Sequence, residues 1–257
     1  MDGFLPYKEV WYSEEKIIDI LIMDKRDLTP FLNILSEPVD FEEFHEYSGF
    51  YIAKNILRKD LGFNAKDKPG DFDVLIIPYT DKKVFFERTA AYEVKIVRPT
   101  RKNPKKASNS LGVTQLKGLI QDGFPLVSLL HICMPEPLLK EERFKTKFCT
   151  IPANSGIPLK NNKLEDNLID VSMDTFPWFG ADLQMKRLIS QDIPKFAGIA
   201  AYGLSITQNN KYLLTTCSYN YAHFQSGYFN PYKKIETISK IQKHFNENPD
   251  KYYNWQK

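Results

Sequence analysis

The segment that most constrains the fold is the nearly unbroken apolar run at residues 126–134, LVSLLHICM. A short apolar run that begins after Gly123 and ends before Pro135 is typical of a strand covered on both faces. Residues 112–122 just before it carry apolar side chains at helical spacing, which predicts an amphipathic helix. With a further apolar strand upstream at residues 84–97, this order predicts a right-handed parallel crossover and therefore an α/β sheet.

Another apolar run, at residues 71–78 (DFDVLIIP), precedes the strand at residues 84–97. The polar turn at residues 79–83 joins the two runs, so they are predicted to pair as a hairpin. The second run is longer than the first, and we therefore expect it to bend at residues 88–90.

A helix is predicted upstream of the hairpin, starting near Asp40 and stopping at Gly62. Asp40 can cap such a helix, and the acidic pair Glu42 and Glu43 suits its first turn. Its apolar residues recur at helical spacing: Phe50, Ala53, Ile56 and Leu57.

The C-terminal half is predicted to hold a polar, proline-rich connector, a short apolar run, a helix, a hairpin and a final helix. These lie at residues 135–163, 168–173, 181–190, 196–217 and 231–245. We divide the chain into a core at residues 1–135, with an N-terminal extension, and a C-terminal extension at residues 136–257. The extension either completes the sheet or forms a small recognition or dimerisation subdomain.

Composition excludes several classes of protein. The chain has 257 residues, of which 42% are hydrophobic, so it is too apolar to be disordered. Its net charge of +3 excludes a histone-like polycation. The three cysteines form no CxxC pair, and neither a membrane-spanning run nor a signal peptide is found. We expect a cytoplasmic protein that has no membrane partner.

Two acidic residues and one lysine stand where neighbouring strands can bring them together. Asp73 opens the first run of the hairpin, and Glu93 and Lys95 lie in the second. Since positions i and i+2 of a strand point to the same face, Glu93 and Lys95 project together. Carboxylates that converge there are ligands that Mg²⁺ prefers, and a metal so held can activate a phosphodiester for hydrolysis. The alternative interpretation is an ordinary solvent-exposed ion pair.

This set resembles the PD-(D/E)XK nuclease superfamily, which includes type II restriction endonucleases, phage exonucleases and Holliday-junction resolvases. The residues that carry the resemblance are Gly70-Asp71-Phe72-Asp73 before an aliphatic run, and Glu93-Val94-Lys95 in the next strand. The resemblance covers residues 40–134 and implies a restriction-endonuclease-like α-β-β-β-α-β core, with a mixed central sheet flanked by helices. The chain departs from the family pattern because no proline stands directly before the aspartate.

The resemblance also implies roles for individual residues. Asp73 and Glu93 would bind Mg²⁺, for which Mn²⁺ can substitute, together with the Val94 carbonyl. Lys95 would serve the nucleophilic water. Gln115, in the helix that follows, would position the water, the phosphate or Lys95. The remaining candidates are Asp71, which competes with Asp73 for the metal, and Glu46 or Glu43, either of which would be the acid that family members often carry in the first helix.

The segment that follows the motif is basic. Residues 98–106 contain five cations and no acid. A flexible basic segment beside a phosphodiester-cleaving site would neutralise backbone phosphates and make binding depend on salt. The candidate nucleic-acid-binding residues are Arg98, Arg101, Lys102, Lys105 and Lys106.

Together these features predict a Mg²⁺-dependent nuclease, an endonuclease acting on DNA rather than RNA. By analogy with the family, such an enzyme suits restriction or anti-phage defence, with a defence-system protein as a further partner. A homodimer fits this function, because cutting two strands needs two sites. Two alternatives remain open: a non-catalytic nucleic-acid-binding subunit, and a scaffold in which Glu93 and Lys95 form only an ion pair.

Overall fold

The computed structural model describes residues 12–23, 32–41, 44–64, 70–106, 111–149, 168–206, 212–216 and 224–256. Its centre is a nine-stranded sheet with the order β10-β8-β5-β4-β2-β1-β11, in which β3 also pairs with β2 and β9 with β8. The strands are β1 (Gly49–Ile56), β2 (Phe72–Thr80), β3 (Lys83–Val84), β4 (Ala90–Val97), β5 (Leu126–Cys133), β8 (Gly198–Ile206), β9 (Tyr212–Thr216), β10 (Phe224–Gln225) and β11 (Tyr253–Gln256).

The sheet is mixed, as expected for the α/β class. β1, β2 and β4 pair antiparallel, whereas β4, β5 and β8 run parallel. Helix α3 (Val113–Asp122) connects β4 to β5, so the predicted helix, the buried strand after it and the parallel crossover are confirmed. The predicted hairpin is confirmed in β2 and β4, and a 3₁₀ turn at Phe86–Arg88 forms the expected bend.

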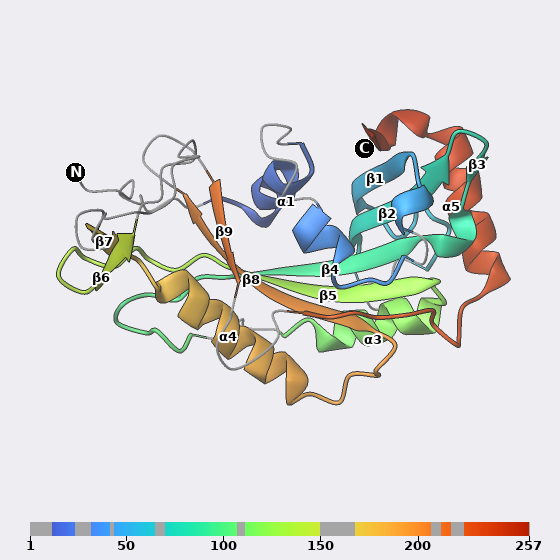
Figure 1. Cartoon of the computed structure of the whole chain (residues 1–257). Helices are drawn as coiled ribbons and strands as arrows, with labels where there is room; N and C mark the ends of the chain where they lie inside the picture. The colour runs from blue at the N-terminus through green and yellow to red at the C-terminus, as the bar shows by residue number, and fades with distance from the viewer. Residues whose placement is uncertain are drawn as a thin grey trace, which may run out of the picture.

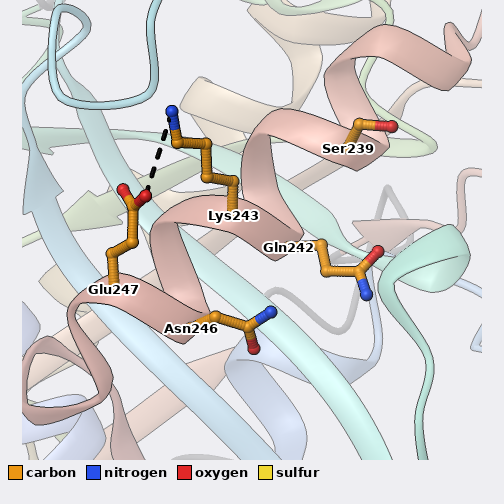
Figure 2. A pocket seen from close by; sticks show the side chains of 5 residues that line it. All are labelled: Ser239, Gln242, Lys243, Asn246 and Glu247. Atoms are coloured by element: carbon orange, nitrogen blue, oxygen red, sulfur yellow. Dashed lines mark ion pairs between the residues drawn. The ribbon is translucent and has the colours of Figure 1, made fainter.

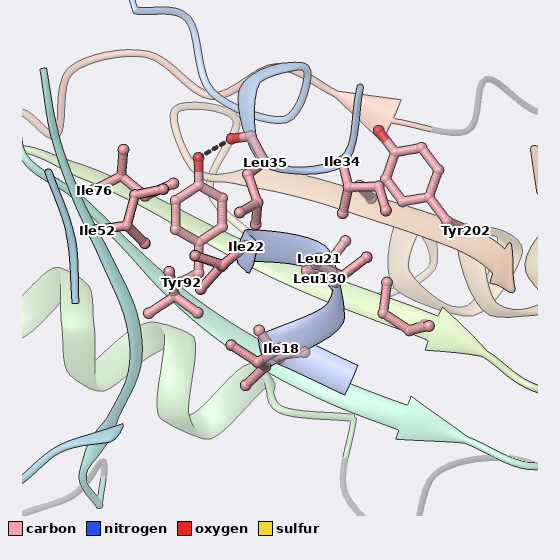
Figure 3. Packing of buried hydrophobic residues seen from close by; sticks show 14 of the residues in the cluster. Ile18, Leu21, Ile22, Ile34, Leu35, Ile52, Ile76, Tyr92, Leu130 and Tyr202 are labelled. Atoms are coloured by element: carbon pink, nitrogen blue, oxygen red, sulfur yellow. Dashed lines mark hydrogen bonds between the residues drawn. The ribbon is translucent and has the colours of Figure 1, made fainter. Parts of the chain in front are cut away.

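Helices cover both faces of the sheet (Figure 1). Helix α1 (Glu14–Met23) lies on one face and packs with the π-helical turn η1 (Leu32–Ser36) into an apolar cluster. Figure 3 shows two tyrosines of this cluster, Tyr92 and Tyr202. The Tyr92 hydroxyl donates a hydrogen bond to the Leu35 carbonyl, and the Tyr202 hydroxyl donates one to Glu37 (2.7 Å).

The opposite face is covered by α3, α4 (Phe176–Ile189) and α5 (Ile235–Glu247). The predicted helix at residues 181–190 corresponds to α4, which begins five residues earlier, at Phe176, and ends at Ile189. The predicted hairpin at residues 196–217 is confirmed as β8 and β9. Because β8, β10 and β11 join the central sheet, the C-terminal residues complete it. Within the described residues, no helix is long and apolar enough to cross a membrane.

The helix predicted from Asp40 to Gly62 is wrong. A short 3₁₀ turn, Phe44–Glu46, is followed by strand β1, which pairs with β2 on one side and β11 on the other. Its apolar residues face both ways, since Phe50 and Ile52 belong to the cluster beneath α1 and Ala53 to the cluster on the opposite face. A strand buried on both faces shows no period-2 alternation, so its apolar residues can be mistaken for a helical stripe.

The connector after β5 contains a separate two-stranded sheet. Strands β6 (Phe144–Cys149) and β7 (Leu168–Met173) pair antiparallel at the end of the molecule away from α5 (Figure 1). Sequence reasoning assigned no strand at β6, whose sequence FKTKFC has three consecutive polar residues at its centre.

Candidate active site

The candidate site lies where β2 separates from β4. The antiparallel ladder between them ends at the pair Val74 and Tyr92, and the next position along β2 is Asp73. Instead of a backbone carbonyl, a side-chain oxygen (Oδ2) of Asp73 accepts the hydrogen bond from the Val94 N–H, at 2.7 Å. Alternate residues of a strand direct both backbone groups to the same neighbour, so the Val94 carbonyl faces this same opening.

A second carboxylate occupies the next backbone position of β4. Glu14, the first residue of α1, accepts a hydrogen bond from the Ile96 N–H and interacts with the charges of Asp73 and Lys95. Because the two strands separate here, the N–H groups of Val94 and Ile96 in β4 have no backbone partner in β2. Each donates instead to a carboxylate. We call the site formed by Glu14, Asp73, Glu93 and Lys95 the carboxylate notch.

Glu93 and Lys95 meet at the notch as the strand geometry predicts. The Lys95 ammonium forms an ion pair with Glu93, and their side chains are 18% and 5% exposed, respectively. The pair is therefore not the solvent-exposed ion pair of the alternative interpretation. Gly112, just before α3, lies against both stems: a Cβ on it would lie 3.3 Å from Lys95 Cγ and 3.4 Å from Glu93 Cγ. Its φ of 74° also favours glycine.

The charges in the notch perturb one another. Burial and the neighbouring Asp73 raise the pKa of Glu93 to about 7, although Lys95 opposes this shift. Burial likewise raises the pKa values of Asp73 and Glu14. The pKa of Lys95 is raised by its hydrogen bond and charge interaction with Glu93, with Asp73 and Glu14 adding to the effect, so its ammonium stays charged at neutral pH.

The donor set suits a hard cation that keeps part of its water shell. Asp73 and Glu93 offer carboxylate oxygens, and the Val94 carbonyl faces the same opening. Across the described part of the chain, no three His, Cys, Asp or Glu side chains are grouped closely enough to form a metal cage of their own. Two carboxylates with open positions are what Mg²⁺ commonly uses when a substrate phosphate completes its coordination. Asp73, Glu93 and the Val94 carbonyl are therefore the groups that would hold such an ion.

Gln115 lies on α3, close in the chain to Gly112. It is one helical turn beyond Gly112 on α3, and its side-chain oxygen is buried without a hydrogen-bond partner. A buried amide oxygen that lacks a donor loses free energy unless a water or ligand supplies one. The role of Gln115 at the notch stays a prediction.

Two of the alternative ligand residues are exposed, although the charge of Asp71 contributes to the raised pKa of Asp73. Glu46 is exposed and stands 3.9 Å from His45 in an ion pair. Asp71 is exposed and accepts a hydrogen bond from the Arg58 backbone N–H, at 2.9 Å. Glu43 lies outside the described residues. The carboxylate that α1 brings to the notch is that of Glu14, which sequence reasoning missed, although Glu14 and Glu15 precede apolar residues at helical spacing.

The basic segment divides into two groups. Arg98 points inward, since its guanidinium donates to the Tyr12 carbonyl and burial lowers its pKa. Arg101 pairs with Glu136, at 2.6 Å, and lies 3.7 Å from Glu142. Both arginines thus have partners within the chain. Three exposed lysines remain for contact with a polyanion: Lys102, Lys105 and Lys106.

The raised pKa of Glu93 predicts a pH-dependent cost in stability. A carboxyl whose folded pKa exceeds its unfolded value favours folding below about pH 4.5, and this contribution is lost as pH rises through about 7. Without divalent cations, Glu93→Gln should raise the free energy of unfolding at pH 8 by up to about 3 kcal/mol, and by little at pH 4. Urea denaturation at both pH values measures this difference.

The matched control is Glu87→Gln, because Glu87 has a lowered pKa and pairs with Lys83. That variant should not gain stability at pH 8. If the free energy of unfolding of Glu93→Gln at pH 8 does not exceed that of wild type, burial of the charged Glu93 carboxylate costs no stability.

A shallow hollow on α5 is unrelated to the notch (Figure 2). It is lined by side chains of this one helix: Ser239, Gln242, Lys243, Asn246 and Glu247. Lys243 and Glu247 form an ion pair across it, at 3.9 Å. A hollow on the outer face of a single helix offers no enclosed binding site.

Comparison with known proteins adds no assignment to this geometry. The chain matches no protein-family model, no curated protein and no solved structure.

Proposed function

We propose that the chain is a Mg²⁺-dependent nuclease that hydrolyses phosphodiester bonds in DNA, with restriction or anti-phage defence as its setting. The observation that carries the proposal is the carboxylate notch, where two strand carboxylates, a helix carboxylate and a charged lysine converge. The order of elements α1, β1, β2, β4, α3 and β5 supports it, because the restriction-endonuclease-like core has this order. The exposed lysines of the neighbouring segment support a polyanionic substrate.

The residues of the notch would have different roles in the reaction. Asp73, Glu93 and the Val94 carbonyl would hold Mg²⁺. When bound, Mg²⁺ supplies Lewis-acid polarisation of the phosphodiester and lowers the pKa of an attacking water. Lys95 remains protonated, so it cannot serve as the base; it donates hydrogen bonds to the attacking water or to the oxygens on which negative charge develops.

The remaining groups orient the others. The Asp73 carboxylate is fixed by the Val94 N–H, and Glu14 by the Ile96 N–H, so neither needs to reorganise when substrate binds. Gln115 presents an unpartnered acceptor to a water or to the Lys95 ammonium.

A panel of substrates tests the function. Supercoiled plasmid, linear duplex DNA, single-stranded DNA and RNA are incubated with the protein in Mg²⁺, Mn²⁺ or EDTA. We expect metal-dependent cutting of DNA, with nicked or linear plasmid products if the enzyme is an endonuclease. Salt-sensitive DNA binding without cutting would favour the binding subunit, and neither cutting nor binding would favour the scaffold.

Replacing Glu14 separates its charge from its hydrogen bond. Glu14→Ala should lower the cleavage rate by about 10- to 100-fold, since groups that orient metal ligands commonly have effects of this size. Glu14→Gln can still accept from the Ile96 N–H, so it should retain more activity than the alanine variant if orientation matters most. The control is Glu15→Ala, at an exposed neighbouring residue. Equal rates for Glu14→Ala and wild type would remove Glu14 from the site.

A further inference from the structure

One face of α4 contacts the basic segment near both of its ends, at Pro99 and at Lys106. Gly180 lies against Cys133 and Pro99, since a Cβ on it would approach the Pro99 ring to 3.7 Å. Further along the same face, the Gln184 amide donates to the Lys106 carbonyl at 3.3 Å. Arg187 donates to the Lys106 carbonyl at 3.2 Å and also to that of Lys105. Positions 180, 184 and 187 share one side of the helix, so α4 acts on the segment as a unit.

A second contact fixes Leu111, which lies just before α3. His131 lies in β5, beside Lys95 of β4, and is fully buried. Its Nε2 lies 3.1 Å from the Leu111 carbonyl. Burial lowers the pKa of His131 to about 4, whereas Leu111 and Gln184 oppose that shift. The ring is therefore neutral at pH 7, and its single N–H is on Nε2, because only a donor can bond to a carbonyl.

Leu111 is adjacent to the glycine that touches the notch. Gly112 packs on the stems of Glu93 and Lys95, and its carbonyl accepts the N–H of Leu116 in the first turn of α3. A shift of Leu111 would therefore move Gly112 away from the ion pair and would carry Gln115 with it. The hydrogen bond from His131, a residue of β5, fixes the position of Leu111.

We infer that His131 is a positioning residue, which through its hydrogen bond to Leu111 seats residues 111–115 against Glu93 and Lys95. Its catalytic consequence rests on the proposed nuclease function, but its structural consequence does not. Helix α4, which belongs to the C-terminal extension, holds the neighbouring residues 105 and 106 through Gln184 and Arg187. His131 itself touches neither metal nor substrate.

Three variants separate the hydrogen bond from the bulk of the ring. His131→Leu removes the donor, His131→Gln places an amide N–H near the position of Nε2, and His131→Asn places one near Nδ1 instead. Hydrogen exchange is measured on the full-length protein, in the absence of DNA, for the amides of α3 and of α5. We expect the first turn of α3 to exchange about 10-fold faster in His131→Leu, while α5 is unchanged and His131→Gln stays close to wild type.

The same variants are then assayed for cleavage. Displacement of a site by about 1 Å can cost roughly 100-fold in rate, so kcat should fall by that order in His131→Leu and recover in His131→Gln, with little change in KM. Unchanged exchange at α3 in His131→Leu, or equal rescue by His131→Asn and His131→Gln, would overturn the inference. If the wild-type protein cuts no DNA, the nuclease proposal fails while the exchange result still decides the positioning role.

Discussion

Replacement of Lys95 by alanine is expected to lower the rate of DNA cleavage by about 1,000-fold, because a preorganised charge that stabilises developing negative charge commonly contributes this much. The Lys95 ammonium is paired with the buried Glu93, and its raised pKa keeps it charged. DNA binding in EDTA should change little, since under the proposed function the exposed Lys102, Lys105 and Lys106 would supply the phosphate contacts. Single-turnover cleavage and an equilibrium binding assay together measure both effects.

The matched control for Lys95→Ala is Lys117→Ala, which removes an exposed lysine of α3 that lies 3.5 Å from Asp192. The control should cut at the wild-type rate. A Lys95→Ala protein that retains more than about a tenth of wild-type activity would assign the lysine to structure rather than to charge stabilisation.

The largest expected loss of stability comes from replacing Arg58. This residue is buried and lies in the chain just after β1, before β2. Its guanidinium forms two hydrogen bonds with the carboxylate of Asp122, at 2.6 and 2.7 Å, and a third with the Asn64 carbonyl. It also lies over the ring of Phe63, 5.1 Å from the centroid. Because Asp122 ends α3, this pair connects the end of β1 to the helix that flanks the notch.

Arg58→Met should therefore lower the free energy of unfolding by about 3–5 kcal/mol, since it leaves the Asp122 charge buried without its partner. The double variant Arg58→Met/Asp122→Leu should lose less than the sum of the two single variants, because it removes both charges. Urea denaturation measures all three, with Lys59→Met as the exposed control. A loss below about 1 kcal/mol in Arg58→Met would show that solvent reaches the pair.

The sequence predicted the parts of the fold in which local pattern and tertiary contacts agree. The apolar run of β5 and the helical stripe of α3 each have a single interpretation, and the polar turn between β2 and β4 favours a hairpin. β1 was mistaken for a helix because it is buried on both faces and one of its partners, β11, is distant in sequence. Such pairing is a property of the assembled sheet and leaves no local signal.

The candidate site was likewise predictable only where it depends on local properties of the sequence. Asp73, Glu93 and Lys95 come together because the period of a strand and the register of a hairpin are local properties. Glu14 was missed because α1 reaches β4 across 80 residues of chain, and nothing in its own segment indicates that contact. Arg98 and Arg101 resemble solvent-exposed cations in sequence, and their partners emerge only in three dimensions.

The most direct test of the proposed nuclease is the cleavage of supercoiled plasmid by wild type and Asp73→Asn, each with Mg²⁺ and with EDTA. Asparagine keeps an oxygen that can accept from the Val94 N–H and removes only the charge, so the sheet should fold unchanged. The carboxylate notch predicts cutting by wild type in Mg²⁺ alone, and none by Asp73→Asn. Absence of cutting by wild type, or cutting that survives either EDTA or the substitution, would contradict it.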